Sequence, residues 1–187
     1  VPAVGGSVTR NLRSPAGVNN GRNCWLASAA AQRRIRGAND RLRAGIIGAG
    51  GRGRYLTAQF KELGVEMGAV CDIYEANLQA GLKEAATGAV AFHDYRKLLD
   101  DKSFDAVVVA TPDHWHSRMV IDAVDAGKDV YVEKPMAHKI EDGYQVIDAV
   151  RRTKRVVQVG TQRVSAELFL EGKKIMESGQ LGEIHLV

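Results

Sequence analysis

The stretch LRAGIIGAGGRG, residues 42–53, decides the fold of this chain. An apolar run leads into a Gly-x-Gly-x-x-Gly turn, and a helix is predicted to open between Arg52 and Tyr55. Gly48 permits the tight turn, Gly50 leaves the backbone open to a diphosphate, and Gly53 lets helix and strand pack closely. The free N–H groups at the start of the helix would then face the phosphates, and we expect Gly51 and Arg52 of the same loop to bind the cofactor as well.

A second apolar run, residues 66–71, ends at Asp72. This acid lies 22 residues beyond Gly50, about the spacing at which a carboxylate accepts hydrogen bonds from the adenosine ribose of a dinucleotide. The alternative interpretation is an ordinary β-α-β turn followed by a solvated aspartate. Order, spacing and flanking runs together favour the dinucleotide site.

Strand and helix patterns alternate along the rest of the chain, which indicates an α/β fold with a doubly wound parallel sheet. In the segment 105–110 the residues after Asp105 are continuously apolar, as expected of a strand buried on both faces. The expected strands are 43–47, 66–71, 89–92, 104–110, 128–132 and 156–160. The expected helices are 53–63, 74–86, 94–100, 115–126, 138–153 and 166–178.

Three regions follow from this pattern. Residues 1–41 form an expected disordered basic leader, 42–163 the nucleotide-binding domain, and 164–187 the truncated start of a second α/β domain. The chain begins with Val1 and stops within the apolar run 184–187, so we expect a fragment.

Composition excludes several classes of protein. At 187 residues and 45% hydrophobic content the chain can bury a sizeable core, and no run is long enough to predict a membrane span. Residues 1–43 carry eight arginines and one aspartate, or +7, so the remainder of the +4 chain is −3. Nucleic acid is therefore not an expected partner. The two cysteines, Cys24 and Cys71, do not suggest a disulfide framework.

Polar residues gather where three expected strands end, namely at 111–116, 133–135 and 160–163. In an open α/β sheet these carboxyl ends border the ligand crevice. The spacing of His114 and His116 raises the question of a metal site. No third ligand accompanies them, and we predict no metal. Lys134 would direct its ammonium into the crevice and contact a substrate oxygen. A salt bridge between Lys134 and either Glu133 or another surface acid is an equally open alternative.

These motifs resemble the N-terminal half of the Gfo/Idh/MocA oxidoreductases, which include glucose–fructose oxidoreductase and inositol dehydrogenase. The resemblance runs from about Asn39 to Val187 and rests on four motifs in the family's order: GAGGRG (48–53), ATPDHWH (110–116), AGK (126–128) and EKP (133–135).

The resemblance implies a Rossmann domain that binds NAD, with NADP less favoured because the Asp72 carboxylate repels a 2′-phosphate. It implies that Lys134 is the active-site lysine and that a cis peptide precedes Pro135. It also implies a cofactor site whose nicotinamide half is lined by the strand-end residues Thr111, Pro112, Asp113, His114, Trp115, His116, Glu133, Lys134 and Gln162.

The expected activity is hydride transfer between nicotinamide and a sugar, inositol or related polyol, by a complete protein that forms a homo-oligomer. One alternative is an NAD-dependent glycosidase of the same family with no net redox change, and another is a dinucleotide-binding protein without catalysis. The chain alone indicates the cytoplasm. Because residues 27–40 resemble the stretch after a twin-arginine signal, the resemblance leaves periplasmic export open.

Overall fold

Among the residues that the structure describes, six parallel strands form a sheet in the order β3-β2-β1-β4-β5-β6. The structure is a computed structural model, and it describes residues 41–183. The expected leader, apart from Arg41, and residues 184–187 of the last expected strand lie outside this range. The strands are β1 (Arg43–Ile47), β2 (Glu66–Cys71), β3 (Val90–Phe92), β4 (Ala106–Val109), β5 (Asp129–Glu133) and β6 (Val157–Gly160).

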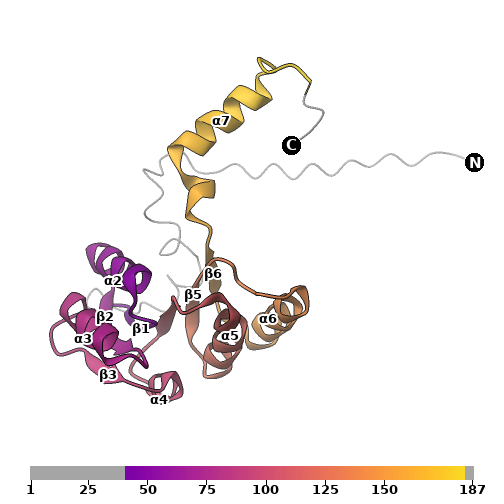
Figure 1. The fold of residues 1–187 in the computed structure, drawn as a ribbon. Helices are drawn as coiled ribbons and strands as arrows, with labels where there is room; N and C mark the ends of the chain where they lie inside the picture. The colour runs from indigo at the N-terminus through magenta and orange to yellow at the C-terminus, as the bar shows by residue number, and fades with distance from the viewer. Residues whose placement is uncertain (1–40, 184–187) are drawn as a thin grey trace, which may run out of the picture.

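Helices connect consecutive strands and confirm the predicted alternation (Figure 1). They are α2 (Gly51–Glu62), α3 (Glu75–Glu84), α4 (Tyr95–Asp100), α5 (His116–Asp125), α6 (Ile140–Thr153) and α7 (Glu167–Glu177), with the short 3-10 helices η1 (Asp113–Trp115) and η2 (Gln162–Ser165). The main difference from expectation is that α2 begins at Gly51, so Gly53 lies within its first turn.

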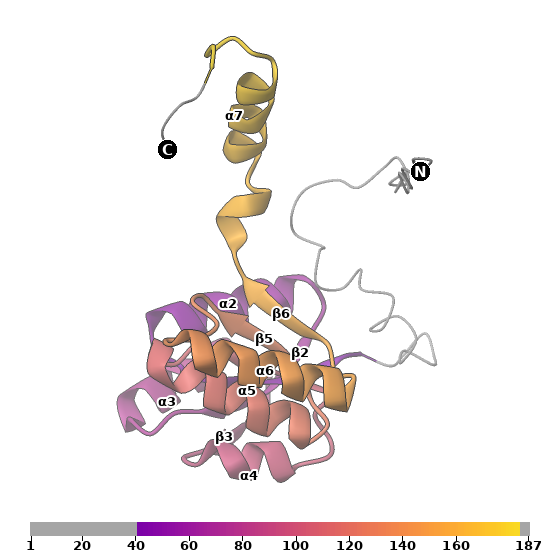
Figure 2. The same ribbon diagram turned by 90° about the vertical axis from the view of Figure 1, so that its right-hand side faces the viewer.

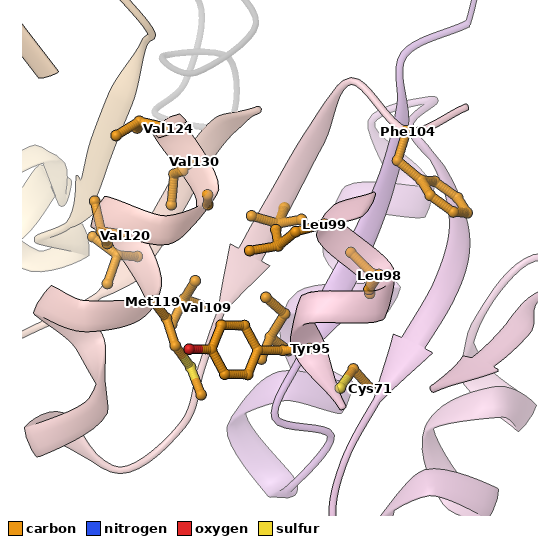
Figure 3. Close-up of a cluster of buried hydrophobic side chains, with 14 of the residues drawn as sticks. Cys71, Tyr95, Leu98, Leu99, Phe104, Val109, Met119, Val120, Val124 and Val130 are labelled. Atoms are coloured by element: carbon orange, nitrogen blue, oxygen red, sulfur yellow. The ribbon is translucent and has the colours of Figure 1, made fainter. Parts of the chain in front are cut away.

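Two apolar layers cover the two faces of the sheet, because successive strand residues point to opposite sides. On one face Ile46 and Val108 pack against α2 and α3. On the other, Ile47 and Val109 pack against α4, α5 and α6, where Leu98 and Val120 are fully buried (Figure 3). The predicted doubly wound arrangement is therefore confirmed (Figure 2).

The strand order reverses at β1, which has β2 on one side and β4 on the other. The chain winds outward from β1 to β3 and then crosses back to β4. Loops on the two sides of this point diverge and leave a crevice at the carboxyl ends of the strands, where ligands of such sheets bind.

The segment after β6 differs from the sheet and its covering helices. Helix α7 extends away from the sheet in both views, and none of its residues is buried (Figures 1 and 2). Its exposed apolar side chains are Leu168, Phe169, Leu170, Ile175 and Met176.

Candidate functional site

A pocket of about 310 Å³ lies at the carboxyl end of the sheet. Its walls come from the segments that follow β1, β4, β5 and β6, so residues far apart in sequence meet there. The lining residues are Arg52, Ala110, Thr111, Asp113, His116, Glu133, Lys134 and Gln162. The sequence predicted all of them except Ala110 as parts of one site.

The glycine turn after β1 has the geometry that a diphosphate needs. Gly48 has φ +90°, and a Cβ there would lie 2.8 Å from the carbonyl carbon of Ala110. A Cβ on Gly53 would overlap the carbonyl oxygen of Gly48, so only glycine lets α2 approach β1 this closely. Around Gly50 and Gly51, in contrast, no atom lies within 4 Å of an added Cβ, and their backbone borders open space that a phosphate can enter.

Asp72 lies beside this turn at the end of β2. Its Oδ2 accepts a hydrogen bond from the Ala49 amide at 2.8 Å, and its Oδ1 accepts one from the Tyr74 amide at 2.8 Å. Each carboxylate oxygen keeps a further lone pair for a ribose hydroxyl. Ile73 follows it with 89% of its surface exposed, so this neighbour offers no charge to a 2′-phosphate. The residues present therefore fit NAD.

His116 joins the loop after β4 to the loop after β5. The imidazole is 2% exposed, and its Nδ1 lies 2.6 Å from the Pro135 carbonyl oxygen. Its Nε2 lies 2.8 Å from the Thr111 carbonyl oxygen. His116 thus lies under the pocket, whereas His114 and Trp115 are exposed on η1, after Pro112 at its N-cap.

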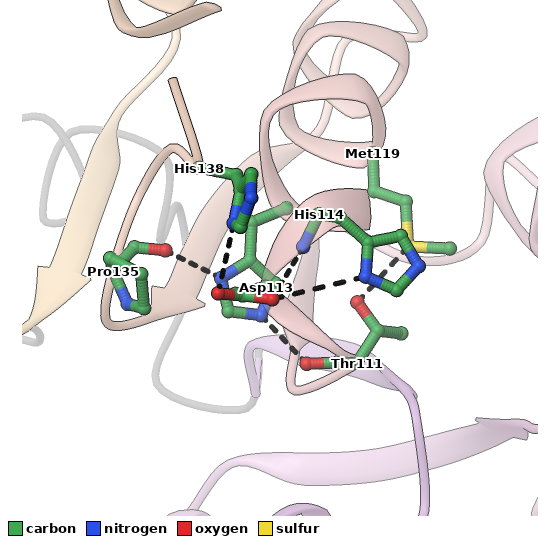
Figure 4. A network of polar contacts seen from close by, with 7 residues as sticks. Thr111, Asp113, His114, Met119, Pro135 and His138 are labelled. Atoms are coloured by element: carbon green, nitrogen blue, oxygen red, sulfur yellow. Dashed lines mark hydrogen bonds and ion pairs between the residues drawn. The ribbon is translucent and has the colours of Figure 1, made fainter. Parts of the chain in front are cut away.

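His138 belongs to the same network, although the sequence analysis did not identify it. Its Nδ1 lies 3.2 Å from Oδ2 of Asp113, and the amide of His114 donates to Oδ1 of Asp113 at 2.9 Å (Figure 4). The hydrogen bond from His138 is the main reason that the pKa of Asp113 lies below its ordinary value. The signal was available, because His138 closely follows the same strand end as Lys134.

At the end of β5, Glu133 and Lys134 have different environments. The Glu133 carboxylate is buried and pairs with Arg52, and the peptide between Lys134 and Pro135 is cis, as expected. Among the residues that the structure describes, no carboxylate pairs with the Lys134 ammonium, so the salt-bridge alternative with Glu133 was wrong. Lys134 is exposed and lines the pocket.

Gln162 closes the pocket from the segment after β6. With its amide oriented so that Nε2 donates to the Gly160 carbonyl, its Oε1 accepts a hydrogen bond from Nη2 of Arg52 at 3.2 Å. Asp72 and the backbone of Gly50 lie toward the β2 side of the site and do not line this pocket. The predicted residues therefore form two connected parts, a glycine turn with an acid and a polar pocket.

Residues 41–183 contain neither a metal-binding cluster nor a helix that could span a membrane. No group of three or more His, Cys, Asp or Glu side chains there is arranged to hold a metal ion. In the same range, none of the helices combines the length and the apolar character that crossing a bilayer requires.

Comparisons with known proteins agree with this geometry. Residues 42–161 match the model of the oxidoreductase family with an NAD-binding Rossmann fold, Gfo/Idh/MocA. Inositol 2-dehydrogenase of Salmonella typhimurium is 34% identical over 145 residues, which are 76% of this chain and 43% of that protein. Alpha-N-acetylgalactosaminidase of Shewanella oneidensis is 36% identical over 123 residues, which are 61% of this chain and 27% of that protein.

Solved structures share the fold. Myo-inositol 2-dehydrogenase of Lactobacillus plantarum superposes with a TM-score of 0.69 at 26% identity, covering 78% of this chain and 43% of that chain. The WlbA dehydrogenase of Chromobacterium violaceum, solved with NADH and UDP-GlcNAcA, gives a TM-score of 0.69 at 26% identity and covers 79% and 43%. The chain spans less than half the length of the relatives that it matches. By its sequence and its fold, the chain belongs to the Gfo/Idh/MocA family of NAD-binding oxidoreductases.

Proposed function

We propose that this chain is the cofactor-binding part of an oxidoreductase that transfers hydride between nicotinamide and a sugar, inositol or related polyol. The observation that carries the proposal is the exposed Lys134 ammonium, which lines the pocket without a carboxylate partner among residues 41–183. An ammonium in this position is available to hydrogen-bond a substrate hydroxyl and to share its proton.

The residues of the site divide the work. The backbone at Gly50 and Gly51 holds the diphosphate, and Asp72 accepts hydrogen bonds from the adenosine ribose. The segment 111–116, with Glu133 and Gln162, borders the nicotinamide half. The bound nicotinamide supplies the hydride chemistry, while Lys134 orients the hydroxyl of the carbon that is oxidised.

Residues 164–187 begin the domain that completes the substrate site in this proposal. The support is the fully unburied helix α7, whose apolar side chains a further domain would cover. A homo-oligomer of the complete protein and its location in the cytoplasm or the periplasm remain predictions.

A glycosidase that uses NAD without net redox change is the second candidate. This candidate is supported by the 36% identity to an alpha-N-acetylgalactosaminidase, which is similar to the 34% identity to inositol 2-dehydrogenases. The two activities are separated by assaying the complete protein on an aryl glycoside and on a panel of polyols with NAD. Release of the aryl group without NADH formation identifies the glycosidase, and NADH formation identifies the dehydrogenase.

Calorimetry on the 187-residue chain tests the cofactor assignment directly. The wild type should bind NAD, and Asp72→Ala should weaken NAD roughly tenfold and reduce the preference over NADP, since hydrogen bonds to a charged group contribute about 1.5–3 kcal/mol. Asp148→Ala, which removes an exposed acid on α6, is the control and should leave both affinities unchanged. An unaltered preference for NAD in Asp72→Ala would remove Asp72 from the ribose site.

A further inference from the structure

An ion pair joins the glycine turn to the far side of the pocket. Nε of Arg52 lies 2.7 Å and Nη2 lies 2.6 Å from Oε1 of Glu133, although the two residues are 81 positions apart. The Glu133 side chain is only 7% exposed. Burial of a carboxylate without a charged partner destabilises the fold, so the guanidinium of Arg52 offsets the free-energy cost of burying Glu133.

The Arg52 side chain reaches across the end of β4 to make this contact. Strands β1 and β5 flank β4 in the sheet, so the two loops are separated by about 10 Å, or two strand spacings. The guanidinium also lies 5.1 Å from the centre of the Tyr55 ring and donates to Gln162. Its orientation is therefore set by protein groups, whereas the adjacent Gly50 and Gly51 backbone remains open for phosphate.

Glu133 transmits this restraint to the next residue. Its second oxygen, Oε2, accepts a hydrogen bond from the Lys134 amide at 3.2 Å. On the other side of Lys134, the Pro135 carbonyl lies 2.6 Å from the His116 ring. The main chain of Lys134 is thus held from two sides while its ammonium stays exposed.

We propose that Arg52 is a positioning residue for Lys134, acting through Glu133, and not a ligand of the cofactor diphosphate. The proposal rests on the proposed role of Lys134 and replaces the expectation that Arg52 belongs to the phosphate loop as a direct contact. Preorganisation of this kind matters because a displacement of about 1 Å at a reacting group can reduce a rate about 100-fold.

The first experiment uses the ¹⁵N-labelled 187-residue chain without ligand. Arg52→Met should move the amide resonance of Lys134, because the Glu133 carboxylate loses its partner and releases that N–H. Arg54→Met is the matched control, since Arg54 lies on the same helix but donates to the Ala49 carbonyl, and it should leave the Lys134 resonance in place. An unmoved Lys134 resonance in Arg52→Met overturns the proposal.

A second pair of variants keeps the test valid if Arg52→Met folds poorly. Glu133→Gln preserves the shape of the side chain and should move the same Lys134 resonance. Combining Glu133→Gln with Arg52→Lys should add little further change, because the two substitutions interrupt the same chain of contacts. Additive shifts would mean that Arg52 and Glu133 act independently, contrary to the proposal.

The third measurement uses ADP, which carries the diphosphate but lacks the nicotinamide. Arg52→Met should bind ADP with an affinity within about twofold of the wild type. In the complete enzyme, Arg52→Met should lower kcat at least about tenfold and leave the KM for NAD unchanged, and Arg52→Lys should recover part of the lost kcat. A tenfold loss of ADP affinity makes Arg52 a diphosphate ligand and refutes the proposal. Failure of the wild type to bind NAD refutes the proposed function instead, and the ligand-free Lys134 resonance still decides the role of Arg52.

Discussion

Two lysines border the same strand and have opposite environments. Lys128, just before β5, is 2% exposed, and its ammonium donates to the carbonyl oxygens of Asp101 at 2.6 Å and Phe104 at 2.8 Å. Lys134, just after β5, is exposed in the pocket with no carboxylate partner in the described part of the chain. The lysine at one edge of the sheet therefore binds main-chain carbonyl groups, whereas the lysine at the other edge is exposed to a ligand in the pocket.

The difference separates side chains that support the fold, at one edge of the sheet, from those of the proposed site at the other. At the amino edge, charged side chains bind main-chain groups. The Asp105 carboxylate does so as well, because it accepts a hydrogen bond from the main-chain amide of Arg43 at 3.0 Å. Burial, assisted by the charge of Lys102, lowers the pKa of Lys128, and the two carbonyls offset part of that cost. At the carboxyl edge Arg52 instead pairs with Glu133, and no carboxylate among residues 41–183 pairs with the Lys134 ammonium.

The largest effect should come from removing the available lysine. Lys134→Ala should reduce turnover of the complete enzyme roughly 10²–10⁴-fold, the range associated with loss of a group that handles a proton, while NAD affinity changes little. Lys139→Ala, which removes an exposed lysine from the same loop, should retain activity. Steady-state kinetics and NAD calorimetry check both variants, and surviving turnover in Lys134→Ala would contradict the assignment.

Removing the buried lysine should act on stability. Lys128→Met should lower the free energy of unfolding by about 2–3 kcal/mol, because two carbonyl groups lose their donor, while NAD affinity is retained. Urea denaturation of the 187-residue chain measures the change. If Lys128→Met is as stable as the wild type, the ammonium does not support the amino edge.

The smallest effect concerns the rim of the pocket. His138→Gln should raise the pKa of Asp113 part of the way to its ordinary value, because the hydrogen bond from His138 is the main cause of the lowered value. A lowered folded-state pKa stabilises the fold above the ordinary pKa, and this contribution is lost as the pH falls through the folded value. Carboxyl titration by NMR checks this, with Asp101 as internal reference because its lowered pKa arises mainly from Ser103. An unchanged Asp113 titration would show that His138 does not set it.

Sequence patterns predicted the fold well because they report local physics. The glycine turn at 48–53 and the continuous apolar strand ending at Val109 each specify their own backbone. The parallel order of strands then follows from alternation and fixes which loops share an edge. For this reason the positions of Asp72, Thr111 and Lys134 could be predicted without coordinates.

The pairings within the site could not be predicted in this way. Which acid Arg52 contacts depends on the reach of a long side chain across β4, and periodicity carries no information on that reach. The sequence left Glu133 as a partner for its neighbour Lys134, whereas the structure pairs it with Arg52, 81 residues away. His116 likewise has two carbonyl partners that depend on the path of the chain around Pro135.

The outermost strands are short: β3 has three residues and β6 has four. A long free strand edge is a template on which another molecule can add its own strand, and natural proteins limit this hazard by shortening their edges. The valine-rich strand β4 lies in the middle of the sheet, where both of its sides are hydrogen-bonded to neighbouring strands. The strand order thus keeps the backbone of this apolar strand from pairing with another molecule while the sheet stays folded.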